Sequence, residues 1–265
     1  MSKKKKQKHI NSISCGQGAP SLYLILMAAA GVFKAETVIV ADTGWENDML
    51  WSNGKRTNAQ EFFLTVTKPL AEAHGMSAHF VRTLDNRKNP LPDLQTTQFP
   101  GTADIPLFGS RGGQLNQSCT SKWKVQGIRQ QLRRMGATTA TCNLGLTITE
   151  LQRVKPNNDV AWETLAWPMI FTLKTHRATA IQKLEDAGVE YLVTSECDGC
   201  PHKDPERWLR TSPEQIAELA KFESRFDNNF FLTSDRIPLM DAIQLMRDGR
   251  SMSAFDPCEN GYCFT

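Results

Sequence analysis

Seven cysteines stand in the sequence, and their spacing suits metal or sulfur chemistry. Cys197-Asp-Gly-Cys200 places two thiols two residues apart, and the glycine between them permits a tight knuckle in which both sulfur atoms face one metal ion. Cys119 opens a basic segment that contains Lys122 and Lys124. Because a helix N-terminus favours the thiolate, Cys119 is also a candidate nucleophile. Cys15 and Cys142 are expected to be buried small hydrophobes.

A second candidate site is the loop that runs from Ser14 to Ser21, with glycines at 16 and 18. It lies between a strand expected at 9–14 and an apolar helix expected at 22–33. In such a loop the backbone N–H groups and the helix N-terminus attract an anion. There is no Gly-Lys-Ser/Thr, so the loop is not a Walker P-loop. The strand at 37–42 ends in Asp42-Thr43-Gly44, which places polar groups at the sheet edge where ligands of open α/β sheets bind.

The elements that must position these residues alternate between strand and helix. We expect helices at 58–74 and 121–135 and strands at 77–82 and 138–146, joined by a long Pro- and Gly-rich connection at 85–113. Thr147 to Glu150 is typical of a capping box. Beyond residue 157 the pattern changes to helices at 175–187 and 212–226 around a short apolar segment at 190–194. The alternation predicts an α/β fold with a doubly wound, mostly parallel, Rossmann-like sheet.

Composition supports three segments: a basic disordered tail at 1–9, a nucleotide-binding domain at 10–156 and a smaller helical part at 157–265 that bears the cysteine cluster. Hydrophobic residues make up 40% of the chain and charged residues 22%, which is ordinary for a globular protein. Without five lysines at positions 3–6 and 8, 26 basic residues face 28 acidic ones, so the positive charge resides in the tail. The tail is interpreted as a solvated end, with a weak nucleic-acid anchor as the alternative.

The apolar run that follows the tail is interrupted by Gly16, Gly18 and Pro20. It is also shorter than the ~20 apolar residues that span a bilayer. We therefore expect no secretory signal and no membrane partner. A cytoplasmic location follows, and because disulfides are rare there, metal or redox chemistry is the better explanation for the cysteines.

The motifs resemble the phosphoadenosine-phosphosulfate reductase-like family of PP-loop ATP pyrophosphatases, in the form carried by phages and actinobacteria. The resemblance extends over nearly the whole chain after Ile10. It rests on Ser14, Gly16, Gly18 and Ser21, on 27–31, on Ala41 to Glu46, on Cys119-Thr120 with Lys124, on Gly145 to Arg153, on Trp167-Pro168, on Ser195 to Pro201 and on Cys258 to Cys263. It implies an adenine nucleotide alpha hydrolase-like sheet that binds ATP with Mg²⁺.

On this resemblance, Ser14, Gly16, Gly18 and Ser21 would hold phosphates, and Asp42, Thr43 and Gly44 would lie at the nucleotide edge or on the magnesium ion. Lys124 would contact phosphate, with Lys122 as a helper. Arg153 would bind an anion or form an ion pair, and Arg129 is expected on a solvated helix face. Pro20 removes one N–H donor from the loop. Cys119, Lys124 and Asp42 are the catalytic candidates.

Related thiolating enzymes hold a four-iron, four-sulfur cluster with three cysteines, and Cys119, Cys197 and Cys200 fit that number, with Cys258 or Cys263 in the last position. A structural Zn²⁺ knuckle is the alternative, because spacing alone does not choose the metal. His202 is expected near this site without being a ligand. The predicted function is an ATP-dependent, AMP-forming, sulfur-handling enzyme that acts on a nucleotide, DNA or RNA with a sulfur-donor protein as partner. The alternatives are a thiol-dependent phosphoadenosine-phosphosulfate reductase and a non-catalytic nucleotide- or nucleic-acid-binding protein.

Overall fold

The computed structural model describes residues 7–155 and 160–251. At its centre, five parallel strands form one sheet in the order β5-β2-β1-β7-β8. These strands are β1 (His9–Ser14), β2 (Thr37–Asp42), β5 (Ser77–Arg82), β7 (Thr139–Leu144) and β8 (Glu163–Ala166). The predicted α/β class with a parallel sheet is confirmed. The adjacent strands β1 and β2 are buried along most of their length, as expected where helices cover both faces.

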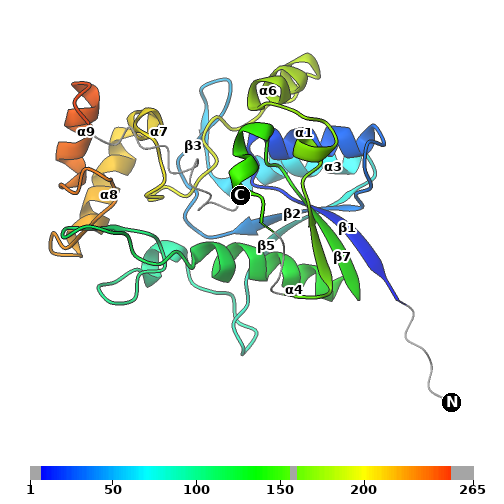
Figure 1. Ribbon diagram of the computed structural model, residues 1–265, viewed down its shortest axis with the longest axis horizontal. Helices are drawn as coiled ribbons and strands as arrows, with labels where there is room; N and C mark the ends of the chain where they lie inside the picture. Colours follow the sequence, from blue (N-terminus) through cyan, green and yellow to red (C-terminus); the bar gives the residue numbers. More distant parts are fainter. Residues whose placement is uncertain (1–6, 156–159, 252–265) are drawn as a thin grey trace.

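Helices cover both faces of this sheet, as in a Rossmann-like fold (Figure 1). One face carries α1 (Ala19–Ala29), α3 (Lys68–Ala73) and α6 (Arg177–Asp186), and the other carries α4 (Gln126–Arg134). Each connecting helix presents apolar residues to the sheet, so the sheet is enclosed between two hydrophobic clusters. The helices expected at 58–74 and 121–135 each contain a π-helical segment, η1 (Phe63–Thr67) after α2 (Ala59–Phe62) and η3 (Thr120–Val125) before α4.

A third hydrophobic cluster lies away from the sheet, and we call the part of the chain around it (91–119 and 197–251) the helical lobe. It contains α7 (Pro205–Arg210), α8 (Pro213–Ser224) and α9 (Leu239–Arg247). The 91–119 segment joins this lobe through β6 (Phe108–Gly109), which pairs with β9 (Phe230–Phe231). Trp45, from the loop after β2, packs its ring 5.0 Å from that of Phe222 on α8. The lobe is therefore assembled from segments far apart in the sequence.

The remaining elements are short. They are the hairpin β3 (Met49–Leu50) and β4 (Arg56–Thr57), the turns η2 (Leu94–Thr97) and η4 (Ile148–Arg153), and α5 (Pro168–Phe171). The capping box at Thr147 and Glu150 is present, as predicted. Among the described residues, no helix is long and apolar enough to cross a membrane.

Several features differ from the sequence-based division of the chain. β8 and α6 lie beyond residue 156, yet β8 completes the sheet and α6 packs on α1. β1 begins at His9, inside the segment expected as a disordered tail, and the backbone N–H of Lys8 donates to Thr138 Oγ1 at 2.8 Å. The expected lysine run at 3–6, Cys258 and Cys263 lie outside the described residues.

Candidate functional site

A cavity of about 640 Å³ lies against the sheet on the side of α4. Its size falls in the range of small-molecule sites. Its walls come from the loop after β1, from β2, β7 and β8, and from one face of η3 and α4. The lining residues are Ser14 to Gln17, Val40, Ala41, Glu46, Met49, Ala59, Asn116, Gln117, Thr120, Ser121, Lys124, Val125, Ile128, Arg129, Cys142, Leu144, Lys155, Glu163, Leu165 and Ser195.

The Gly/Ser loop contributes only its first half to this cavity. Ser14 and Gly16 line it, whereas Gly18 and Ser21 do not. The Ser21 hydroxyl donates to the carbonyl of Gly18 at 3.0 Å and thus closes the first turn of α1. A Cβ added to Gly18 would lie 2.8 Å from Ser195 Oγ. The segment that contains Ser195 therefore covers the start of α1. At this point Ser195 lines the cavity, and the N-terminus of α1 does not.

Two other features fix the loop. Gln17 adopts a left-handed backbone with φ of 61°, and its buried amide donates to the carbonyl of Ala59 at 3.0 Å and accepts from Thr67 at 3.1 Å. Pro20 occupies the first turn of α1, where an amide N–H has no partner within the helix. Its missing N–H therefore costs the helix nothing, and Pro20 does not line the cavity.

Ion pairs fix the loop after β2, and Asp42 does not line the cavity. Arg82 binds the Asp42 carboxylate through Nε at 2.9 Å and Nη2 at 2.7 Å, and also contacts Asp93. Gly44 has a φ of +70°, and a Cβ there would lie 2.0 Å from Asp93 Oδ1. A magnesium role for Asp42 would therefore require the ion pair with Arg82 to open. Thr43 is buried and donates through Oγ1 to Glu46 Oε2 at 2.5 Å.

Glu46 connects this loop to the cysteines. The Cys197 thiol donates to Glu46 Oε1 at 3.1 Å, and Cys197 Sγ lies 3.5 Å from Thr43 Oγ1. Burial, followed by the Glu46 carboxylate, holds the pKa of Cys197 well above its ordinary value. Lys124 lines the cavity beside them. Burial alone would lower its pKa, but the three nearby thiols and Glu46 hold the pKa above its ordinary range.

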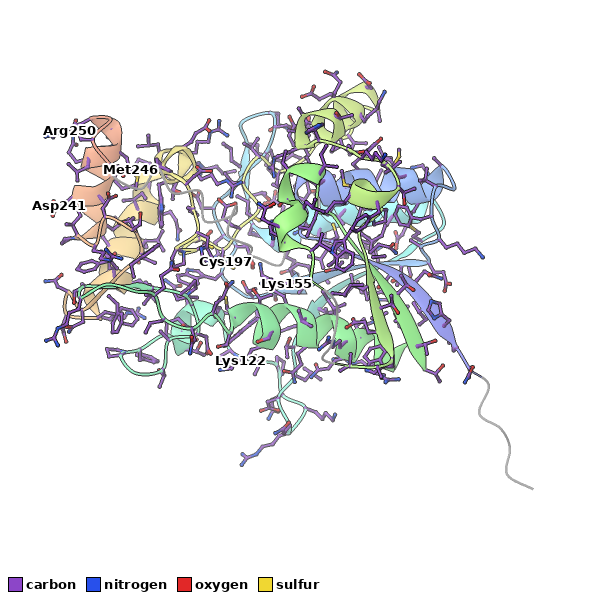
Figure 2. All side chains as sticks on the ribbon, viewed as in Figure 1. Lys122, Lys155, Cys197, Asp241, Met246 and Arg250 are labelled. Carbon is purple, nitrogen blue, oxygen red and sulfur yellow. The ribbon has the colours of Figure 1, made fainter. Side chains whose placement is uncertain are left out.

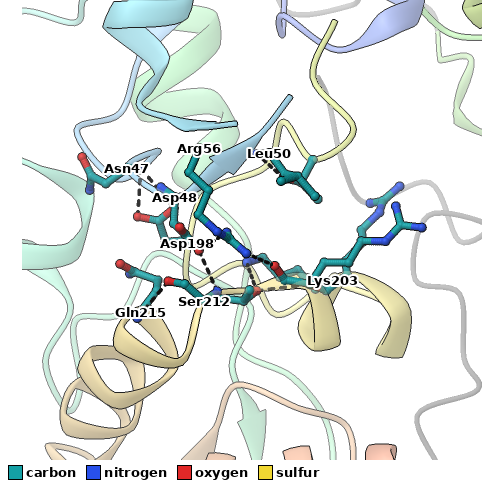
Figure 3. A network of polar contacts seen from close by, with 12 residues as sticks. Asn47, Asp48, Leu50, Arg56, Asp198, Lys203, Ser212 and Gln215 are labelled. Atoms are coloured by element: carbon teal, nitrogen blue, oxygen red, sulfur yellow. Dashed lines mark hydrogen bonds and ion pairs between the residues drawn. The ribbon is translucent and has the colours of Figure 1, made fainter. Parts of the chain in front are cut away.

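The loop at 197–200 and the loop at 45–48 are locked together. The N–H of Asp198 donates to the carbonyl of Trp45 at 2.7 Å, and its carboxylate accepts from the N–H groups of Asn47 at 3.0 Å and Asp48 at 3.1 Å (Figure 3). Burial raises the pKa of Asp198 to about 6, against the effect of Lys203. A Cβ on Gly199 would lie 2.3 Å from the ring of Trp45. Glycine is thus needed between the two cysteines because an indole lies against it.

The three expected cysteines gather near Lys124. Electrostatic interactions join Cys200 to both Cys119 and Cys197, and Lys124 to all three. Nevertheless, within 7–155 and 160–251 no group of three or more His, Cys, Asp or Glu side chains is placed to hold a metal ion. Cysteine thiols are suitable ligands for an iron–sulfur cluster or for zinc, but in the described structure these side chains are not arranged as a set of metal ligands. The fourth expected ligand, Cys263, lies outside the described residues.

The other thiols behave in two ways. Burial raises the pKa of Cys119, with Cys200 as the second cause, so the prediction that a helix start would favour its thiolate is wrong. The buried Cys15 and Cys142 match their prediction, and burial raises their pKa values to about 11 and about 12. Both also line the cavity. His202 is buried near Gln117, and burial, followed by the charge of Arg153, lowers its pKa to about 4.

The predicted cations have different positions. Lys122 is exposed, pairs with Asp104 and does not line the cavity (Figure 2). Arg129 was expected on a solvated face, but it lines the cavity and binds the buried Glu163 through Nε at 2.7 Å. Arg153 is 4% exposed and contacts Glu150, while its Nε and Nη2 have no hydrogen-bond partner in the described part of the chain.

Sequence reasoning missed several lining residues. Glu46 was predicted near the site only as the end of the segment 42–46, and no local signal linked it to Cys197. Ser195 precedes the cysteine motif but gave no sign that it would cover Gly18. Lys155 is exposed at the cavity (Figure 2). Glu163 lies in β8, a strand too short and too polar to be recognised by apolar alternation.

Comparison of the chain with protein-family models, with curated proteins and with solved structures gives no match.

Proposed function

We propose that the protein is an ATP-dependent, AMP-forming enzyme that transfers sulfur to a nucleotide or nucleic acid. The observation that carries this proposal is the contact between the cysteine loop and a residue that lines a nucleotide-sized cavity. Cys197 contacts Glu46, and Glu46 and Lys124 both line that cavity. The resemblance of the motifs to the phosphoadenosine-phosphosulfate reductase-like PP-loop family supports the same reading.

The chemical steps assign a task to each part of the site. A substrate oxygen attacks the α-phosphorus of ATP, and pyrophosphate leaves. A persulfide on a cysteine, loaded by a sulfur-donor protein, then attacks the activated carbon, and AMP leaves. A second cysteine attacks the remaining S–S bond, which releases the thiolated product and leaves a disulfide that an external thiol reduces. Cys197 and Cys200 are our candidates for these two thiols, with Cys119 as the third cysteine nearby.

The cations account for the charge of the nucleotide. The backbone of Gly16 and the side chain of Lys124 line the cavity and suit phosphate oxygens, and Lys155 adds a charge at the exposed side. Arg153 does not line the cavity, but its unpartnered Nε and Nη2 suit a separate anionic group, because buried donors without partners are unfavourable. Mg²⁺ would arrive with the nucleotide and neutralise the phosphates.

A metal at the cysteines is a separate part of the proposal. Binding would require Cys119, Cys197 and Cys200 to rearrange and Cys263, or Cys258, to supply the last ligand. An iron–sulfur cluster would supply an open iron that binds sulfide, and zinc would supply structural stability. No step above depends on either metal.

The test is a pyrophosphate-release assay with the full-length protein, ATP, Mg²⁺ and nucleic-acid substrates. We expect release that depends on both ATP and a nucleic acid or nucleotide acceptor. A reductase would instead release sulfite from phosphoadenosine-phosphosulfate, and its nucleophile would be Cys258 or Cys263. Tight ATP binding without release of either product would favour the non-catalytic binding protein.

A further inference from the structure

The inner part of the cavity contains a buried ion pair that the proposed chemistry does not use. Arg129 Nε lies 2.7 Å from Glu163 Oε2, and the Glu163 side chain is only 3% exposed. Both residues line the cavity, next to apolar side chains of α4, β7 and β8. Taking two charges out of water is unfavourable, and such a pair is often no more stabilising than apolar residues. A role in ligand recognition would explain why it is placed here.

The sheet register and the helical wall both separate this ion pair from the phosphate end. In the sheet register, Ser14 lies opposite Leu144, and Glu163 lies opposite Ala140, four residues back along β7. At about 3.3 Å per residue, the two levels are about 13 Å apart. Along the helical wall, Lys124 and Arg129 are five residues apart, or about 7.5 Å at 1.5 Å each. The cavity is therefore elongated along the sheet.

The two ends suit the two ends of a nucleotide. The end beside the loop after β1 presents the backbone of Gly16 and the side chain of Lys124, which suit phosphates. Between the ends, Val40, Ile128 and Leu165 offer apolar walls for a flat ring. At the inner end a carboxylate accepts hydrogen bonds and a guanidinium donates them. This is the complement of an exocyclic amine next to a ring nitrogen, which is the pattern that adenine presents through N6 and N7.

Resting on the proposed function, we propose that Arg129 and Glu163 determine base specificity by reading the edge of the purine: Glu163 accepts from the exocyclic amine and Arg129 donates to the ring nitrogen. Inosine triphosphate replaces the amine with a carbonyl oxygen, which would face the Glu163 carboxylate. 7-Deaza-ATP replaces the ring nitrogen with C–H and would leave an Arg129 donor without its acceptor.

The experiment measures the binding of ATP, inosine triphosphate, 7-deaza-ATP and tripolyphosphate to the full-length protein by titration calorimetry. We expect ATP to bind roughly 5- to 150-fold more tightly than either analogue. In Glu163→Gln the ATP preference over inosine triphosphate should shrink, because an amide can donate to the carbonyl oxygen. The matched control is Glu72→Gln. It removes a carboxylate that pairs with Lys68 at an exposed position on α3, and it should leave the ratio of ATP to inosine triphosphate affinity unchanged. Ratios within one protein are independent of any change in its stability.

The outcomes separate the base-reading proposal from the proposed function. Equal binding of ATP and both analogues by the wild type would overturn base reading while leaving a nucleotide-binding enzyme in place. An unchanged ratio in a folded Glu163→Gln would also overturn it. If that variant does not fold, the comparison of ATP with the two analogues on the wild type still decides. Failure of ATP and tripolyphosphate to bind would instead overturn the proposed function, and base reading with it.

Discussion

The thiol of Cys197 donates a hydrogen bond to Glu46 at 3.1 Å, although the two residues are 151 positions apart in the chain. The contact joins the loop after β2 to the cysteine knuckle. Because the pKa of Cys197 is raised by burial and by this carboxylate, the thiol remains protonated until a cation or a reaction partner arrives. Lys124 is a cation that interacts electrostatically with Cys197, and it is the first residue to test.

Lys124→Met should reduce pyrophosphate release by roughly 10²- to 10³-fold, the usual effect of removing one group that stabilises developing charge. The matched control is Lys122→Met. It removes a lysine two residues away that is exposed, pairs with Asp104 and does not line the cavity. Its turnover should stay close to that of the wild type. Equal losses in the two variants would contradict the assignment of Lys124 to the site.

Gly199→Ala should destabilise the protein, because the new Cβ would lie 2.3 Å from the Trp45 ring. Overpacking of this kind costs about 1–3 kcal/mol. Trp45→Phe supplies the matched test, since the smaller ring leaves room for the added methyl group. In denaturant unfolding, the double variant should lose less stability than the sum of the two single variants. Strict additivity would show that the indole and the glycine do not constrain each other.

Arg153→Met should separate stability from anion binding. Removing a buried guanidinium with two unpartnered donors should raise the melting temperature in buffer without phosphate. The wild type should gain more stability than the variant as phosphate is added. Arg134→Met, at an exposed position on α4, is the control and should retain the anion effect. An identical response of the Arg153 variant to anions would show that this arginine serves no ligand.

Glu223 offers a test of pH dependence in the helical lobe. Its buried carboxylate accepts from the N–H groups of Leu232 at 2.7 Å and Leu239 at 2.6 Å, and burial raises its pKa above the ordinary value. A raised folded-state pKa makes the contribution of this group largest below the unfolded pKa, and the contribution is lost as pH rises through the folded pKa.

Glu223→Gln replaces one acceptor with an amide N–H₂, which should cost about 1–3 kcal/mol. Because the variant does not titrate there, its deficit relative to the wild type should narrow as pH rises above about 4.5. Thermal unfolding at about pH 3.5 to about pH 7 would measure this deficit. The range is chosen from typical carboxyl pKa values. Glu218→Gln on the exposed face of α8 is the control. A deficit that grows with pH would be the opposite of the expected linkage.

The cysteine proposal predicts metal in protein purified without oxygen. An iron–sulfur cluster would give visible absorption that Cys197→Ser removes, whereas zinc would give a colourless protein in which Cys197→Ser lowers stability. Cys142→Ser is the matched control, because it changes an equally buried thiol on β7. Metal-free wild-type protein would leave sulfur transfer to depend on the thiols alone.

Local sequence patterns predicted the strands and helices of the fold better than they predicted the residues of the candidate site. Apolar runs located β1, β2, β5 and β7, but β8 has only four residues, two of them polar or charged, so it could not be distinguished from a loop. Arg129 could not be placed in the cavity because its partner Glu163 lies in that unrecognised strand. The cover of Gly18 by Ser195 and the link between Glu46 and Cys197 are tertiary contacts, and no local propensity encodes them.

The contact between Trp45 and Phe222 also constrains synthesis of the chain on the ribosome. The two rings lie 5.0 Å apart, yet 177 positions separate them. At about 5–20 residues per second, roughly 9–35 s pass between the appearance of the indole and that of its partner. During this interval Trp45 and the apolar residues of 91–119 have no lobe to enter. Nascent chains paused before residue 222 should therefore be the species that chaperones bind and that aggregate most readily.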